Sequence, residues 1–227
     1  MIVLRGRRAE PGPDRTVTRD LASRVARTGE PAVRVWYPPC QVVFGRRDRA
    51  ADGYERAKRA AESRGYPTTV RETGGRAVAF TGDVLALARA ESVDAAVTGT
   101  DERYERALAD LESALAELGV AAERGEPPDS FCPGTRSLSA EGKLVGLAQR
   151  VRAEVAVVGG LVVVRNEGTV AAVLGPVYEA LDVPFDPASA GSLDGAGGET
   201  DRDGARATVE DALVGDAAAT VRRVRET

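Results

Sequence analysis

Predicted strands repeatedly follow one another along this chain with no helix between them, and this order narrows the folds that it can adopt. Apolar runs that alternate or are rich in β-branched residues predict strands at 32–37 and 41–44, at 68–71, 76–80 and 84–90, and at 144–152 and 155–164. A parallel, doubly wound sheet would need a helix between successive strands. The order therefore favours an α+β fold with a mixed β-sheet, in which the last pair of strands forms a hairpin.

Helices are predicted between these strands, at residues 16–27, 48–64, 100–118 and 169–181. The clearest is 100–118, where leucines recur every third or fourth residue and form one apolar stripe. The pair Gly175-Pro176 is expected to kink or split the helix at 169–181.

The remaining segments carry weaker patterns. Residues 1–15 indicate the start of a strand followed by a loose arm, and 123–142 indicate a loop rich in Pro, Gly and Ser. Residues 186–204 are expected to be a flexible loop, and 205–225 a final helix. We expect a single domain over residues 1–227, with its core at about 16–182.

Composition excludes several kinds of chemistry. The chain has no histidine, so Ser-His-Asp and Cys-His catalysis and zinc sites that need imidazole are ruled out. Cys40 and Cys132 are too few for a four-cysteine zinc site, although a disulfide between them stays open. We predict no metal site. The net charge of −4 argues against nucleic acid as a partner, and no apolar run is long enough to cross a membrane. A cytoplasmic location is expected.

Lysine is rare here, since Lys58 and Lys143 are the only lysines among 31 basic residues. Lysine can lose its proton and presents a compact charge, whereas arginine keeps its proton. Lys143 opens an apolar strand, so it is either a functional cation or an edge lysine that reaches solvent. Gly146 and Ala148 alternate on that strand and leave room for a ligand against the sheet.

Two further segments are candidates for a site. Gly74 and Gly75 lie between two strands with arginines on both sides, which indicates either a phosphate or carboxylate site or an ordinary tight hairpin. Cys132 is followed by Pro133 and Gly134 on a loop. It is either a nucleophile, activated by a nearby cation, or a packed apolar residue.

In this order, the segments resemble the lipoate/octanoate protein ligase and transferase family, which has a biotin/lipoate A/B protein ligase-type catalytic domain. The resemblance spans roughly residues 16–182 and rests on RETGGRAV at 71–78 and GKLVGLAQR at 142–150, with VWYPP at 35–39 and VVFG at 42–45 in support. The run FCPG at 131–134, followed by SLS at 137–139, is most similar to the branch of cysteine-dependent octanoyl-carrier amidotransferases.

This resemblance implies a mixed sheet flanked by helices, as in biotin protein ligases and class II aminoacyl-tRNA synthetases, forming one catalytic domain. It implies that Cys132 takes the acyl group as a thioester and that Lys143 holds and polarises the acyl carbonyl. The implied substrates are an octanoyl or lipoyl group and lipoyl-carrier proteins, namely the glycine-cleavage H protein and E2 lipoyl domains. No cofactor is required in this interpretation.

The resemblance also implies a set of substrate-binding residues. Asp83 is expected to replace the histidine or aspartate that many relatives have after the glycine turn. The set consists of Arg71, Thr73, Gly74, Gly75, Arg76, Asp83, Gly146, Ala148 and Gln149.

Two alternatives remain open. The first is an ATP-dependent lipoate ligase that uses ATP and Mg²⁺, with Arg71, Arg76 and Lys143 around an acyl-adenylate. Such ligases usually carry an Asn-Asp pair in place of the cysteine loop, and some have a large C-terminal accessory domain. We expect the segment after Leu181 to be too short for that domain, so that such a ligase would need a separate subunit to supply it. The second is a non-catalytic member that binds lipoyl domains or an acyl ligand.

Overall fold

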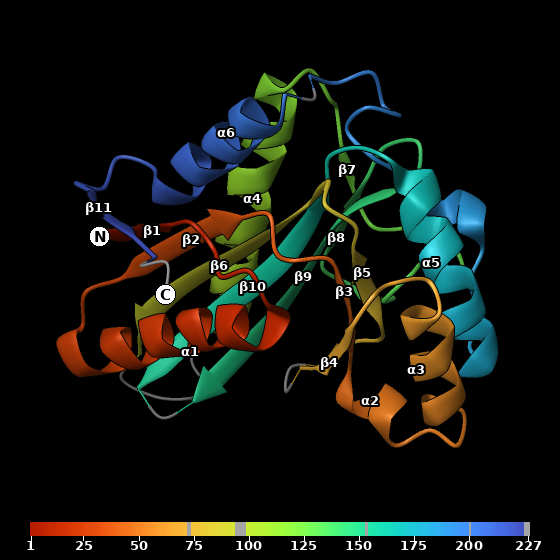
Figure 1. Cartoon of the computed structure of the whole chain (residues 1–227). Coiled ribbons are helices and arrows are strands. Elements are labelled where there is room, and N and C mark those ends of the chain that lie inside the picture. Colours follow the sequence, from red (N-terminus) through yellow and green to blue (C-terminus); the bar gives the residue numbers. More distant parts are fainter. Residues whose placement is uncertain (72–73, 94–98, 153, 200, 225–227) are drawn as a thin grey trace.

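The computed structural model describes residues 1–71, 74–93, 99–152, 154–199 and 201–224. Within these residues it contains a large sheet and a smaller one (Figure 1). The large sheet has the order β11 (Thr220–Arg223), β1 (Ile2–Arg5), β2 (Ala32–Trp36), β6 (Val84–Ser92), β10 (Val155–Val163), β9 (Lys143–Arg152), β8 (Ser137–Ser139) and β7 (Glu123–Arg124). The smaller sheet has the order β4 (Thr68–Val70), β3 (Gln41–Phe44) and β5 (Val78–Phe80).

Both sheets are mixed, whereas the sequence predicts one mixed sheet. Strand β1 runs parallel to β2 and β11, and β3 runs parallel to β4, whereas the other neighbours are antiparallel. Strands β9 and β10 form the expected hairpin, with Val155 opposite Arg152 and Val162 opposite Val145. The α+β fold class is therefore confirmed.

Helices cover both faces of the large sheet. They are α1 (Pro11–Thr28), α2 (Arg46–Arg49), α3 (Tyr54–Glu62), α4 (Thr100–Glu117), α5 (Glu167–Ala180) and α6 (Arg202–Val214), with a 3-10 turn at Pro187–Ser189. Figure 1 shows α4 and α6 on one side of the sheet and α1 on the other, with α3 and α5 beside the smaller sheet. Among the described residues, no helix combines the length and apolar character that crossing a bilayer requires.

The predicted leucine stripe forms part of the main core. Leu111 and Leu115 of α4 are fully buried and belong to one cluster with Val33 and Val35 of β2. Because side chains of a strand alternate between faces, Ala32 of β2 points the other way and packs with the residues of α1. The same alternation leaves the α1 face of the middle strands free to line a site.

A buried ion pair fixes α1 over this second face. Arg34 of β2 donates from Nη2 to Asp14 Oδ1 of α1 at 2.6 Å, and both side chains are almost fully buried. Trp36 Nε1 donates to the other carboxylate oxygen of Asp14 at 2.8 Å. Helix α1 begins at Pro11, and Pro and Asp14 in its first turn suit a helix start. The prediction of a loose arm within residues 1–15 is therefore wrong.

Two predicted helices differ from the structure because of local packing. The helix expected at 48–64 is divided into α2 and α3, and a Cβ at Gly53 between them would lie 1.8 Å from the Ala180 carbonyl oxygen. Helix α5 continues through Pro176 without the expected break. The carbonyl that loses its helical donor belongs to Ala172, which is exposed, so water can satisfy it.

Three segments expected to be loop or helix also differ. Strands β7 and β8 lie within the loop predicted at 123–142. The final helix expected at 205–225 ends at Val214, and Thr220–Arg223 forms β11, which pairs with β1. The loop at 186–204 is not loosely held, because Leu193 is fully buried and the Gly191 N–H donates to the Lys143 carbonyl at 3.1 Å.

Candidate active site

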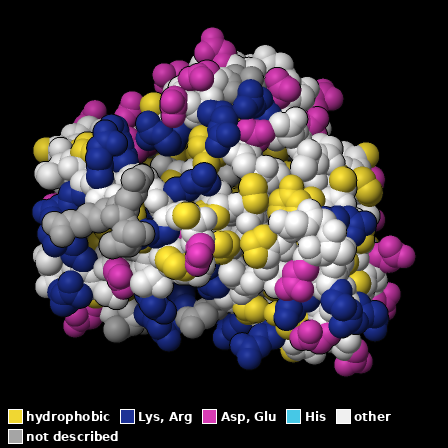
Figure 2. Space-filling view, in the orientation of Figure 1, with side chains coloured by type: hydrophobic (Ala, Val, Ile, Leu, Met, Phe, Trp, Pro, Cys, Tyr) yellow, Lys and Arg dark blue, Asp and Glu magenta, His cyan; other side chains and the backbone are white. Residues whose placement is uncertain are grey.

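A cleft of about 950 Å³ lies between α1, the smaller sheet and the middle strands of the large sheet. Its floor is made of cross-strand rows of mostly small residues, which leave the sheet surface open: Ala86, Leu161 and Gly146 in one row, and Ala88, Gly159 and Ala148 in the next. Figure 2 shows hydrophobic side chains gathered in the middle of this view of the molecule, with Lys and Arg side chains around them. The arrangement suits an apolar ligand with a polar end.

Cys132 lines this cleft and is partly exposed. Its backbone has a positive φ of 46°, which is unusual for a non-glycine residue. The Cys132 N–H donates to Tyr178 Oη at 2.5 Å, and Arg71 Nη2 donates to Cys132 Sγ at 3.2 Å. Both cysteines are free, so the possible disulfide with Cys40 does not form. The loop therefore holds a reduced sulfur beside a cation.

Lys143 is 1% exposed, so it is not an edge lysine that reaches solvent. Its Nζ donates to Glu126 Oε2 at 2.5 Å, to the Phe131 carbonyl at 3.0 Å and to the Cys132 carbonyl at 2.9 Å. An ammonium group has three hydrogens to donate, and each has an acceptor here. Every acceptor belongs to residues 126–132, so Lys143 fixes the segment that carries Cys132.

Glu126 is a site residue that the sequence reasoning missed. Besides Lys143, it accepts hydrogen bonds from the Gly134 N–H at 2.7 Å and from Ser137 Oγ at 2.8 Å. It thereby connects both ends of the cysteine loop to β8 and β9. The available signal was the scarcity of lysine, because a buried lysine needs a carboxylate partner and Glu126 precedes the loop.

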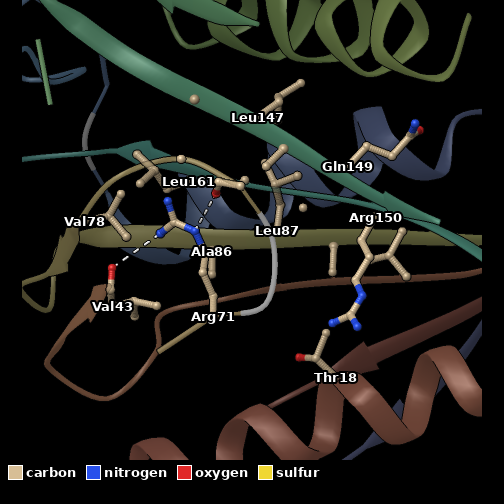
Figure 3. A pocket seen from close by; sticks show the side chains of 18 of the residues that line it. Thr18, Val43, Arg71, Val78, Ala86, Leu87, Leu147, Gln149, Arg150 and Leu161 are labelled. Atoms are coloured by element: carbon tan, nitrogen blue, oxygen red, sulfur yellow. Dashed lines mark hydrogen bonds between the residues drawn. The ribbon is translucent and has the colours of Figure 1, made fainter. Parts of the chain in front are cut away.

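Arg71 follows β4 and reaches the cysteine from the other side of the cleft. Backbone carbonyls hold its guanidinium, with Nε on Gly74 O at 3.0 Å, Nη2 on Arg76 O at 2.6 Å and Nη1 on Val43 O at 3.4 Å. Figure 3 shows the Arg71 side chain between Val43 and Val78 on one side and Ala86 and Leu161 on the other. The glycine turn thus closes around an arginine of the chain itself.

Tyr178 of α5 is a second residue that the sequence reasoning missed, because it falls on the apolar pattern of a core helix. Its hydroxyl donates to the Ala77 carbonyl at 2.9 Å and accepts from the Cys132 N–H. Burial raises the pKa of Tyr178 well above its ordinary value, and the neighbouring Cys132 adds to the effect. The phenol therefore stays neutral and positions the cysteine backbone.

The structure brings together most of the predicted site residues. Those that line the cleft are Arg71, Gly74, Gly75, Cys132, Lys143, Gly146, Ala148 and Gln149. Gln149 lies farther along β9, next to Arg150 (Figure 3). Its Oε1 accepts from Arg103 Nε at 2.8 Å. Arg76 instead pairs with the buried carboxylate of Asp48 at 3.1 Å. Thr73 lies outside the described residues.

Asp83 is not among the residues that line the cleft. It lies before β6 and bonds to Asn166 Nδ2 at 2.5 Å and to Arg165 Nη2 at 3.1 Å, with Arg202 also close. Burial alone would raise its pKa, but the hydrogen bonds from Asn166 and Arg165 and the charges of both arginines outweigh burial and lower it. The geometry gives Asp83 a structural task, which is to tie β6 to the start of α5.

Replacing Asp83 with asparagine is expected to make the fold less sensitive to acid. A carboxyl whose pKa is depressed in the folded state adds stability above its unfolded pKa, and this stability is lost as the pH falls through the folded value. The free energy of unfolding of the wild type should therefore exceed that of Asp83→Asn by up to about 1 kcal/mol at pH 7, and this difference should disappear below about pH 4. Urea unfolding at pH 7, 5, 4 and 3 measures it, with Asp216→Asn as an exposed control. A difference in free energy of unfolding that persists at pH 3 would contradict the lowered pKa of Asp83.

Comparisons with known proteins agree with this geometry. Residues 16–180 match the family model of the lipoyl protein ligase A/B catalytic domain. An octanoyl-[GcvH]:protein N-octanoyltransferase of Geobacillus kaustophilus is 34% identical over 127 residues, which are 55% of this chain and 45% of that protein. A protein of the same name from Kyrpidia tusciae is 33% identical over 172 residues, 72% of this chain and 56% of that protein. The chain spans about half the length of these curated relatives.

Solved structures show the same fold at lower identity. A crystal structure of lipoate-protein ligase A bound with ATP superposes with a TM-score of 0.72, at 16% identity, over 99% of this chain and 89% of that chain. At this identity the likeness supports the arrangement of strands and helices.

Proposed function

Because this chain belongs to the family of the lipoyl protein ligase A/B catalytic domain, we propose that it transfers an octanoyl or lipoyl group to the lysine of a lipoyl-carrier protein through a thioester on Cys132. The observation that carries the proposal is the sulfur of Cys132, held beside the Arg71 guanidinium in a cleft with an apolar floor. Cys132 is the proposed nucleophile, and Lys143 is proposed to assist it.

The proposed reaction exchanges one lysine amide for another in two steps. In the first, the Cys132 sulfur attacks the carbonyl carbon of the donor amide, the S–C bond forms and the C–N bond breaks. The thiol proton leaves to water, and the released lysine amine takes up a proton. In the second, the amine of the acceptor lysine attacks the thioester, the N–C bond forms and the C–S bond breaks. The amine gives its proton to water, and the sulfur leaves as the thiolate. A covalent intermediate divides a difficult exchange into two easier ones.

Lys143 is proposed to act mainly through the loop that carries Cys132. All three of its hydrogens are already given to Glu126 and to the carbonyls of Phe131 and Cys132. Holding the acyl carbonyl, as the family resemblance implies, requires Lys143 to release one backbone carbonyl when the substrate binds. The cleft floor around Gly146 and Ala148 is proposed to receive the acyl chain.

We propose that the reaction needs no ATP. The two arginines that the ligase alternative would place around an acyl-adenylate have other partners: Arg71 bonds to backbone carbonyls and to Cys132, and Arg76 pairs with Asp48. The names of the relatives, which are octanoyltransferases, support the same interpretation. The proposed donor is the octanoyl-loaded glycine-cleavage H protein, the proposed acceptor is an E2 lipoyl domain, and the proposed location is the cytoplasm.

The test is to incubate the purified chain with an octanoyl-loaded H protein, without ATP, and to record its intact mass. We expect an octanoyl adduct that hydroxylamine removes, because a thioester is labile to this nucleophile and an amide is not. Addition of an apo E2 lipoyl domain should then discharge the adduct and raise the mass of that domain.

Two results would reject this proposal. Modification of the lipoyl domain that occurs only with lipoate, ATP and Mg²⁺ would assign the chain to the ligases. Binding of the carrier with no adduct and no product, with or without ATP, would assign it to the non-catalytic members of the family.

A further inference from the structure

We propose that Arg71 is a further catalytic residue, whose guanidinium stabilises the negative charge on the Cys132 sulfur; its part in acyl transfer rests on the function proposed above. Nη2 of Arg71 lies 3.2 Å from Sγ of Cys132. The thiolate, not the thiol, is the attacking form, and the chain has no histidine that could pair with it. A positive charge in contact with the sulfur therefore acts on the reacting atom itself.

The guanidinium is held in place by neutral groups. Three neutral backbone carbonyls, of Gly74, Arg76 and Val43, fix its orientation. Within the described part of the chain, none of the hydrogen bonds of Arg71 goes to a carboxylate. Lys143 differs, because it is paired with Glu126 and faces backbone oxygens. Of the two cations next to Cys132, Arg71 is the one directed at the sulfur.

Gly75 provides the space for this contact. It has a φ of +91°, and a Cβ at this position would lie 2.6 Å from Arg71 Nη2 and 2.6 Å from Cys132 Sγ. A methyl group here would enter the gap between the arginine and the sulfur. The glycine turn, which the sequence indicates as a possible phosphate or carboxylate site, thus lets an arginine reach a cysteine.

Arg71 would serve both steps of the proposed transfer. Before the first step it favours the thiolate, whose electron pair forms the S–C bond as the C–N bond of the donor amide breaks. In the second step the C–S bond breaks and its electron pair returns to the sulfur. The leaving thiolate is again stabilised by the same guanidinium, while the attacking amine gives its proton to water.

The test measures the sulfur directly, by alkylation of the full chain in a Cys40→Ser background so that only Cys132 reacts. Iodoacetamide is neutral and iodoacetate is negatively charged, so the ratio of their rates reports the charge beside the sulfur. We expect Arg71→Gln to slow alkylation by iodoacetamide about tenfold at pH 7, which is the effect of one opposite charge in contact with the sulfur. It should also lower the ratio of the iodoacetate rate to the iodoacetamide rate. Arg71→Lys retains a positive charge, so its ratio of alkylation rates should stay close to that of the wild type. Arg47→Gln, an exposed arginine of α2, is the matched control and should change neither.

A second pair of variants leaves Arg71 in place. Gly75→Ala should slow alkylation as Arg71→Gln does. Gly65→Ala should be alkylated at the wild-type rate, because Gly65 also has a positive φ, of +82°, but is exposed, and a Cβ there meets nothing within 4 Å. Circular dichroism and thermal unfolding confirm that each variant is folded. Equal rates and equal ratios in the wild type, Arg71→Gln and Gly75→Ala would overturn the inference.

The alkylation test and the test of the proposed function can fail independently. Alkylation needs no acyl donor, so a wild type that forms no octanoyl adduct but shows the Arg71 effect would reject the transfer and keep the arginine–sulfur pair. An adduct that forms while Arg71→Gln alkylates like the wild type would keep the transfer and reject the role of Arg71.

Discussion

Replacing Cys132 with serine is expected to abolish the hydroxylamine-labile adduct and to slow octanoyl transfer between carrier domains by more than about 10³-fold, the order of loss that follows removal of a covalent nucleophile. A serine hydroxyl is almost wholly protonated at neutral pH, and the chain has no histidine to accept its proton. The fold should survive, because the partly exposed Cys132 side chain is replaced by one of similar size. Mass spectrometry of the acceptor domain over time gives the rates of octanoyl transfer by the wild type and by Cys132→Ser.

Cys40→Ser is the control for this prediction. Cys40 is the other free cysteine, it is exposed and it lies outside the cleft, so its replacement should leave the transfer rate within about twofold, as expected for a surface change. A Cys132→Ser variant that kept a tenth or more of the wild-type rate would show that the acyl group does not pass through this sulfur. The adenylate route of the ligases would then become the better account.

The sequence predicts those parts of the site whose residues are close together along the chain. Lys143, Gly146 and Ala148 lie on one strand, and period-2 alternation is enough to place Gly146 and Ala148 on one face. The contact between Arg71 and Cys132 joins residues that are far apart in sequence, and it depends on how β4 and the cysteine loop meet in space. Pattern alone could identify each residue as a candidate but could not pair them.

Burial explains which elements of the fold were predictable. Helix α4 is recognised because Leu111 and Leu115 repeat along one buried face, and burial imposes that repeat. Strand β11 is exposed along its whole length, so nothing forces its side chains to alternate, and its short sequence fits a helix equally well. Tyr178 could not be predicted as a site residue, because a buried tyrosine in an apolar helix has the same sequence pattern as a core residue.

Replacing Glu126 with alanine is expected to destabilise the fold by about 3 kcal/mol, because it leaves a buried ammonium group without its counter-charge. Lys143 is 1% exposed and would keep only the carbonyls of Phe131 and Cys132 as partners. Lys143→Met should cost less, about 1–2 kcal/mol, because the buried charge disappears with the substitution. Glu126 would then keep the Gly134 N–H and the Ser137 hydroxyl as donors, and its side chain is 16% exposed.

The double variant separates a charge effect from simple loss of packing. If the cost of Glu126→Ala comes from the stranded charge, adding Lys143→Met removes that charge, and the double variant should be more stable than Glu126→Ala alone. Urea unfolding of the wild type, both single variants and the double variant completes the cycle. Costs that simply add would mean that Lys143 and Glu126 support the cysteine loop independently. A double variant that is as stable as the wild type but slow in octanoyl transfer would show that the fold does not require the pair and that octanoyl transfer does.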